Sequence, residues 1–166
     1  MSDYQAYTAD DIAVADFVRA QTPEHSVFMT GNQHLNPVAS LAGRTIVCGS
    51  DLYLYYHGFT TTGRKAEVQA FYENPQGNAA LLTKYGVRYI YVSAWERAKY
   101  AVDEAALRAL YPLMYESADG NSLIFEVPQA ASAAPSTQVS VDTPAQTPVP
   151  SPTSTPDATP TPTPAA

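Results

Sequence analysis

The chain has 166 residues, a formal net charge of −7 and a single cysteine. This length allows one ordinary domain. The nine Lys and Arg residues are spread along the chain without forming a cluster, which excludes the basic face of a nucleic-acid-binding protein. One cysteine permits neither an intramolecular disulfide nor a cysteine-rich metal cluster. Because no apolar run has the length of a membrane span, we expect no direct membrane insertion of this chain and no secretion signal within it.

Proline divides the sequence into two parts. Four of the 14 prolines precede Pro128, and the other ten lie from Pro128 onward. Residues 129–166 are mostly Ala, Ser, Thr and Pro, a composition that cannot bury enough apolar surface to offset the entropy of ordering. We therefore predict a globular α/β domain over residues 1–128 and a disordered Ser/Thr/Pro-rich tail over residues 129–166. Tails of this composition commonly carry O-linked sugars outside the cytoplasm.

The first predicted element is a helix over residues 9–21. Thr8 is a typical N-cap residue, and Asp10 and Asp11 follow it in the first turn, where acidic side chains complement the helix dipole. Apolar residues then recur at helical spacing until Pro23 ends the pattern. We interpret this apolar stripe as a packing face.

An α/β unit over residues 26–51 organises the rest of the chain. A strand is predicted over 27–30 and a second over 45–48, each a short apolar run followed by polar residues, as in buried parallel strands. Between them, a helix begins at Pro37, where the missing N–H is tolerated. Gly43 is predicted to end that helix in a left-handed cap.

A pair of helices and a third strand follow. Thr62 is predicted to cap an amphipathic helix that ends at Asn74, and a second helical piece covers residues 78–85. Gly86 is predicted to end that piece as a left-handed cap. Residues 87–92 are rich in β-branched and aromatic side chains, which favours a strand.

The last elements are a helix and a hairpin. We predict a helix over residues 103–110 and strands over 113–117 and 122–127, joined by a turn at Asp119 and Gly120. Helical crossovers between the first three strands predict parallel pairing. The fold class that we expect is α/β: a three-layer, Rossmann-like, mainly parallel sheet with a C-terminal antiparallel hairpin.

Polar and aromatic residues follow the predicted strands, at the carboxyl ends where open α/β sheets bind ligands. Polar side chains there can bond sugar hydroxyls, and tyrosine rings can stack on a sugar face. The alternative left open is that these rings cover the exposed edge of the sheet. The candidate binding residues are Asn32, His34, Asn36, Ser50, Asp51, Tyr53, Tyr55, Tyr56, His57, Arg64 and Glu96.

Several common chemistries find little support in the sequence. The loop over residues 31–36 has one glycine, whereas a dinucleotide fingerprint needs several, and no Gly-x-Ser-x-Gly motif is present. A metal site would require His34, His57 and Asp51 to converge, and we expect neither a metal nor a cofactor. Acid–base chemistry by Asp51 or Glu96 with His34 stays open beside the simpler hypothesis that these side chains cap loops and pair with arginines.

The run Gly31-Asn32-Gln33-His34-Leu35-Asn36-Pro37, the run Leu41-Ala42-Gly43-Arg44 and the segment 85–92 carry a family resemblance. Over roughly residues 8–127 the chain resembles the C-terminal soluble domain of multi-spanning membrane proteins similar to lipid-linked-sugar glycosyltransferases of the GT-C type. In such proteins the membrane portion carries the catalytic carboxylate. The resemblance implies an extracytoplasmic, accessory domain, and it assigns no catalytic residue to this chain.

Our hypothesis from the sequence is therefore an extracytoplasmic accessory or glycan-recognition module of a membrane glycosyltransferase-like protein, not catalytic by itself. Its expected partners are a glycan or the membrane-embedded glycosyltransferase portion. Two alternatives remain. The first is a small stand-alone hydrolase or transferase with its site at the carboxyl ends of the strands, and the second is a structural docking domain.

Overall fold

The chain divides into two units, Met1–Ser136 and Thr137–Ala166. The computed structural model describes residues 6–50 and 62–128, all in the first unit. The predicted tail lies outside the described residues. The helices are α1 (Ala9–Gln21), α2 (Pro37–Ser40), α4 (Thr62–Glu73), α5 (Ala80–Tyr85), α6 (Ala94–Lys99) and α7 (Glu104–Leu110). The strands are β1 (Val27–Met29), β2 (Thr45–Ile46), β3 (Val87–Val92), β4 (Leu113–Glu116) and β5 (Leu123–Glu126).

The strands form one five-stranded sheet in the order β2-β1-β3-β5-β4. Strand β1 pairs in parallel with both β2 and β3, whereas β5 pairs antiparallel with both β3 and β4. The mixed α/β class, the parallel start and the antiparallel end that the sequence predicted are confirmed. In the part of the chain that the structure describes, no helix has both the length and the apolar character of a membrane span.

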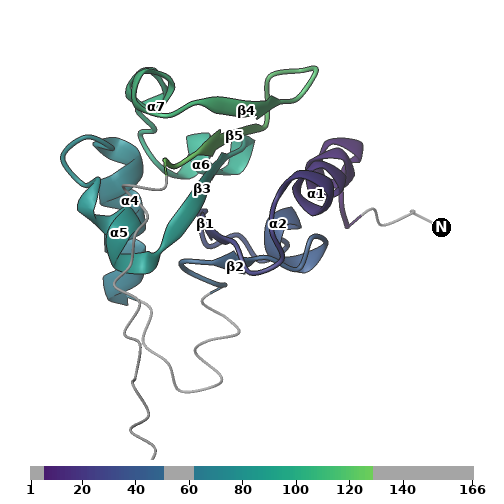
Figure 1. The fold of residues 1–166 in the computed structure, drawn as a ribbon, viewed down its shortest axis with the longest axis horizontal. Helices are drawn as coiled ribbons and strands as arrows, with labels where there is room; N and C mark the ends of the chain where they lie inside the picture. The colour runs from purple at the N-terminus through teal and green to yellow at the C-terminus, as the bar shows by residue number, and fades with distance from the viewer. Residues whose placement is uncertain (1–5, 51–61, 129–166) are drawn as a thin grey trace, which may run out of the picture. The chain divides into compact units, whose positions relative to one another are not determined.

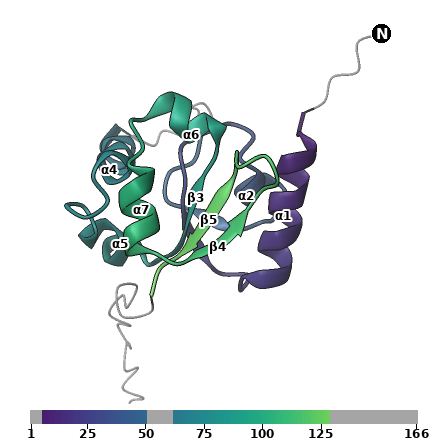
Figure 2. The same cartoon turned by 90° about the horizontal axis from the view of Figure 1, so that it is seen from above.

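Helices cover both faces of the sheet (Figures 1 and 2). Helices α1 and α2 lie on one face, and α4, α5 and α7 lie on the other. The central strand β3 supplies both cores because its side chains alternate: Tyr89 and Tyr91 pack toward α1, whereas Ile90 and Val92 pack toward α4 and α7. A strand buried on both faces is mostly apolar, which accounts for the composition of β3 apart from the partly buried Arg88.

Helix α1 begins where its sequence predicts. The Thr8 side chain accepts a hydrogen bond from the Asp11 backbone N–H at 3.1 Å, and the Asp11 carboxylate accepts one from the Thr8 N–H at 2.8 Å. This reciprocal capping box satisfies backbone groups that the first turn of a helix leaves free. The apolar stripe that follows is buried against the sheet through Val14, Ala15 and Val18.

Both glycines that were predicted as caps have left-handed backbone geometry, but only Gly86 is the C-cap of its helix. Helix α2 has Leu41 as its C-cap, so Gly43 lies beyond the end of that helix. Gly43 has a φ of 69° and Gly86 a φ of 63°, both in the left-handed region. The Gly86 N–H donates to carbonyl oxygens of the last turn of α5, at Leu82 and Thr83, so the helix ends there and β3 begins at the next residue. The glycine thus sets the entry point of the central strand.

Replacing Gly86 by Ala should lower the free energy of unfolding by about 1–2 kcal/mol, because a Cβ is disfavoured in the left-handed region. No atom lies within 4 Å of a Cβ built on Gly86, so the cost should come from the backbone alone. Urea denaturation measures it, and Gly86→Asn should recover part of the loss because Asn tolerates this conformation. Wild-type stability for the alanine variant would contradict the assignment.

The structure differs from the sequence-based elements at several bounds and by one additional helix. Helix α5 begins at Ala80 and not at residue 78, and Thr62 lies within α4 and not at its cap. Strand β2 ends at Ile46, and not at Cys48 as expected, although the Val47 N–H still donates to the Phe28 carbonyl at 3.0 Å. Helix α6, directly after β3, was not predicted. Its signal was present, because Ser93 and Glu96 form a Ser-x-x-Glu capping box.

Candidate functional site

The order of the strands sets the place of the site. From β1 the chain goes to β2 on one side, and it later returns to β3 on the other side of β1. The loops that leave the carboxyl ends of β1 and β3 therefore run in opposite directions, which opens a crevice between them in folds of this kind. Gln33 follows β1, and Ser93 and Trp95 follow β3.

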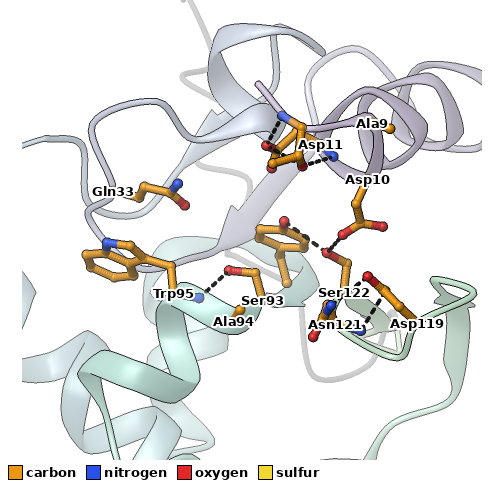
Figure 3. Close-up of a pocket in the computed structure, with 12 residues that line it drawn as sticks. Ala9, Asp10, Asp11, Gln33, Ser93, Ala94, Trp95, Asp119, Asn121 and Ser122 are labelled. Atoms are coloured by element: carbon orange, nitrogen blue, oxygen red, sulfur yellow. Dashed lines mark hydrogen bonds between the residues drawn. The ribbon is translucent and has the colours of Figure 1, made fainter. Parts of the chain in front are cut away.

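A pocket of about 670 Å³ lies at this edge of the sheet. We call it the Trp95 pocket. Its volume falls in the range of pockets that hold small molecules. Figure 3 shows Trp95 and Gln33 at one end, Asp119 and Asn121 at the other, and the first turn of α1 alongside. The lining residues are Thr8, Ala9, Asp10, Asp11, Gln33, Tyr91, Ser93, Ala94, Trp95, Asp119, Asn121 and Ser122.

A hydrogen-bonded chain attaches α1 to the sheet beside the pocket. The Ser122 hydroxyl donates to the Asp10 carboxylate at 2.5 Å, and the Tyr91 hydroxyl lies 3.4 Å from the Ser122 oxygen (Figure 3). Since the Ser122 proton is directed at Asp10, Tyr91 is the donor of the second bond. Burial raises the pKa of Tyr91, which keeps its hydroxyl protonated. One carboxylate oxygen of Asp10 accepts the hydrogen bond from Ser122, and Asp10 is still one of the residues that line the pocket.

The turn between β4 and β5 forms the far end of the pocket. The Asp119 carboxylate accepts hydrogen bonds from the Ser117 hydroxyl at 2.6 Å and from the Asn121 backbone N–H at 3.0 Å. It also accepts one from the Asn121 side-chain amide at 2.5 Å. These donors lower the pKa of Asp119 to about 2, so the group is negatively charged at neutral pH.

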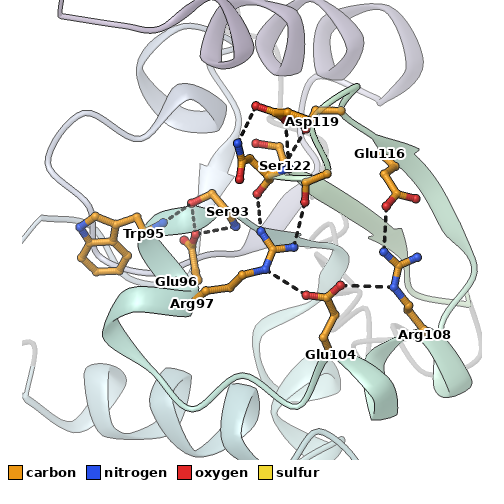
Figure 4. A network of polar contacts seen from close by, with 12 residues as sticks. Ser93, Trp95, Glu96, Arg97, Glu104, Arg108, Glu116, Asp119 and Ser122 are labelled. Atoms are coloured by element: carbon orange, nitrogen blue, oxygen red, sulfur yellow. Dashed lines mark hydrogen bonds and ion pairs between the residues drawn. The ribbon is translucent and has the colours of Figure 1, made fainter.

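Arg97 holds this turn against α6. Its guanidinium donates to the Asn121 carbonyl at 2.5 Å and to the Gly120 carbonyl at 3.3 Å, and it pairs with Glu104 at 3.0 Å (Figure 4). Glu104 pairs in turn with Arg108 at 3.3 Å. A planar guanidinium that bonds two carbonyls and a carboxylate orients the turn more firmly than one ion pair does.

The Trp95 end of the pocket is held by close packing. A Cβ on Gly31 would come within 2.1 Å of a ring carbon of Trp95, so only glycine fits beneath the indole. The edge of the Trp95 ring meets Tyr100, with ring centroids 5.9 Å apart. The indole is thus partly buried against the core, and the ring still contributes to the pocket lining.

Glu96 is fully buried beneath the same end. Its carboxylate accepts hydrogen bonds from the Gly31 N–H at 2.9 Å, the Ser93 N–H at 2.9 Å and the Ser93 hydroxyl. Burial raises the pKa of Glu96, and these donors act in the opposite direction. The side chain links the loop after β1 to the first turn of α6, and so it supports the pocket without lining it.

The charge of the lining limits what the Trp95 pocket can hold. Three aspartates, Asp10, Asp11 and Asp119, are among the lining residues, and none of the lining residues is Lys or Arg. The negative charge of these aspartates would repel an anionic ligand inside the pocket. Carboxylate, amide and hydroxyl groups beside an indole match a ligand with several neutral hydroxyl donors and an apolar face.

A second hollow, of about 420 Å³, lies on the β2 side of Gln33, which lines both. We call it the Asn36 hollow. In it the His34 Nδ1 atom lies 3.3 Å from the Ser50 hydroxyl. Its lining residues are Gln33, His34, Leu35, Asn36, Ala39, Ser40, Ile46, Gly49 and Ser50.

The predicted site residues fall into separate groups. His34, Asn36 and Ser50 come together in the Asn36 hollow, whereas Asn32 is in the same loop and lines neither cavity. Arg64 belongs to α4, and its guanidinium lies 5.6 Å from the centroid of the Tyr85 ring, away from both cavities. The predicted residues that lie outside the described parts are Asp51, Tyr53, Tyr55, Tyr56 and His57.

Sequence reasoning did not identify most of the Trp95 pocket. Asp10 and Asp119 each had a sufficient local role, as a first-turn acid and as a turn residue, and Trp95 was not among the candidate binding residues. These residues meet because the amino end of α1 and the turn before β5 lie at the carboxyl edge of β3. Within the described residues, no group of three or more His, Cys, Asp or Glu side chains is placed to hold a metal ion.

Comparisons with known proteins identify no family for this chain. No protein-family model matches the chain, and no curated protein sequence matches it.

Proposed function

We propose that this chain is an extracytoplasmic recognition module that binds a neutral saccharide in the Trp95 pocket and serves a membrane glycosyltransferase-like protein, without catalysis of its own. The observation that carries the proposal is the lining of that pocket. It combines one half-buried indole with amide, hydroxyl and carboxylate groups, and it includes no basic side chain.

Each part of this lining has a counterpart in a sugar. The C–H face of a pyranose is apolar and packs on an aromatic ring, for which Trp95 is available. Hydroxyl groups donate to carboxylates such as that of Asp10 and bond to the amides of Gln33 and Asn121. Nucleotides and sugar phosphates would bring negative charge beside the three aspartates, so a neutral ligand is favoured.

Fold and sequence support the same proposal. A three-layer, Rossmann-like arrangement binds ligands where the strand order reverses, and the Trp95 pocket is at that edge. The resemblance of residues 8–127 to soluble domains of GT-C-type proteins supplies the saccharide class, the extracytoplasmic location and the membrane partner. The alternative of a stand-alone hydrolase or transferase would use Asp51, His34 and Glu96. Asp51 lies outside the described residues, and the Glu96 carboxylate is fully buried and accepts three hydrogen bonds, which does not favour this alternative.

The proposal predicts that the full chain binds neutral oligosaccharides, such as cellobiose, more tightly than oligosaccharides that contain a uronic acid. Asn121→Ala should weaken neutral-sugar binding about tenfold, as expected for the loss of a hydrogen bond and of its support for Asp119. Isothermal titration calorimetry measures both effects.

Gln69→Ala is the matched control. Gln69 is also exposed, and its amide also bonds a carboxylate, that of Glu73 at 2.8 Å, but it lies on α4 away from both cavities. Its affinity should equal that of the wild type. Tighter binding of the uronic-acid ligand, or equal losses in the two variants, would contradict the proposal.

A further inference from the structure

Asn36, one of the residues that line the Asn36 hollow, has a buried side-chain donor without a partner in the part of the chain that the structure describes. Asn36 caps α2, and its Oδ1 accepts from the Val38 N–H at 3.0 Å. That bond assigns the two ends of the amide, so the other end is the Nδ2 donor. Asn36 is 1% exposed, and no described residue accepts a hydrogen bond from Nδ2. A buried amide donor without an acceptor is costly, and a bound acceptor would relieve the cost.

The residues around Asn36 indicate which chemical group, beyond a hydrogen-bond acceptor, the Asn36 hollow would bind. Leu35, Ala39 and Ile46 give the Asn36 hollow an apolar part, and His34 and Ser50 give it a polar rim. An acetamido group has the matching features: a carbonyl oxygen that accepts from an amide N–H, a methyl group that packs on aliphatic side chains, and an N–H for a polar neighbour. A hydroxyl group in the same place would leave the apolar part empty.

We propose that the Asn36 hollow receives the acetamido group of an N-acetylated sugar whose neighbouring sugar unit occupies the Trp95 pocket. This inference rests on the proposed function, and it narrows the ligand to a neutral oligosaccharide that contains an N-acetylhexosamine. Gln33 lines both cavities, so one side chain contacts both parts of such a ligand. The Asn36 hollow then selects for the acetamido group, whereas the Trp95 pocket binds neutral sugars with or without that group.

The test compares two disaccharides with the full chain. N,N′-diacetylchitobiose and cellobiose have the same linkage and differ in acetamido against hydroxyl groups at C2. We expect diacetylchitobiose to bind at least tenfold more tightly to the wild type by calorimetry. Asn36→Asp keeps an acceptor for the Val38 N–H, since Asp caps helices as well as Asn, and it removes the amide donor. This variant should bind both disaccharides with similar affinity.

Two further variants keep the result interpretable. Asn36→Ser keeps the cap without a carboxylate, and it should also lose the preference. Asn74→Asp makes the same change where Oδ1 accepts from the Gly77 N–H at 2.9 Å, outside both cavities, and it should keep the preference. Equal binding of both disaccharides by the wild type, or an unchanged preference in both Asn36 variants, overturns this inference alone. Failure of the wild type to bind either sugar overturns the proposed function as well.

Discussion

Replacing Gly31 by Ala should destabilise the domain by about 2 kcal/mol and shift the fluorescence of Trp95. A Cβ at this position would come within 2.1 Å and 2.8 Å of two ring carbons of Trp95, far inside contact distance. The indole must therefore move or tilt. The φ of Gly31 is not in the left-handed region, so the effect should come from the clash and not from backbone strain.

The measurement is direct because Trp95 is the only tryptophan in the chain. Urea unfolding gives the loss of stability, and the emission maximum of the folded state reports the displaced ring. Gly63→Ala is the matched control: nothing lies within 4 Å of its added Cβ, and the residue is helical. Its stability should stay unchanged or rise by up to about 1 kcal/mol. Equal behaviour of the two variants would refute the packing of Trp95 on Gly31.

Replacing Glu96 by Leu should cost about 3 kcal/mol or more of unfolding free energy. The change leaves the buried N–H groups of Gly31 and Ser93 without an acceptor and removes the capping box of α6. Glu96→Gln should cost less, because its one carbonyl oxygen still serves one of the two N–H groups. Glu73→Leu is the matched control, because Glu73 is exposed at the end of α4. This variant should change the free energy of unfolding by no more than about 0.5 kcal/mol. If Glu96→Leu is as stable as Glu73→Leu, the hydrogen bonds of the Glu96 carboxylate do not stabilise the fold.

Glu96 also predicts a pH dependence. Burial raises its folded-state pKa above the ordinary value of 4.5, so the folded chain binds the proton more tightly than the unfolded chain. This contribution to stability is fully present below pH 4.5 and is lost as the pH rises through the raised pKa. Thermal unfolding from pH 4 to pH 8 should therefore show a loss in the wild type that Glu96→Gln lacks. If the wild type instead gained stability relative to Glu96→Gln as the pH rises, the folded-state pKa of Glu96 would be lowered and not raised.

Local rules predicted most of the elements. The N-cap at Thr8, the left-handed glycines at 43 and 86, the strand over residues 87–92 and the Asp-Gly turn each depend on neighbours within a few residues, and each was placed within a residue or two. Helix α6 was missed although its capping box is equally local. Its six residues are too few to show an apolar stripe at helical spacing.

The site was less predictable because its residues are brought together by topology. Asp10 and Ser122 are 112 positions apart in the chain, yet they share a hydrogen bond. No local pattern encodes that contact. The rule that ligands bind at the carboxyl ends of strands located His34, Asn36 and Ser50 around one hollow. It did not include α1 or the β4–β5 turn, because neither follows a parallel strand.

The single indole N–H of Trp95 provides the most direct test of saccharide recognition. In a ¹H–¹⁵N spectrum of the full chain, this one resonance should shift saturably as cellobiose or N,N′-diacetylchitobiose is added, together with the side-chain amides of Gln33 and Asn121. The amide of Gln69 on α4 should stay in place. If neither sugar moves the indole resonance at concentrations up to about 10 mM, well above a weak dissociation constant, the Trp95 pocket is not a saccharide site and the proposed function is wrong.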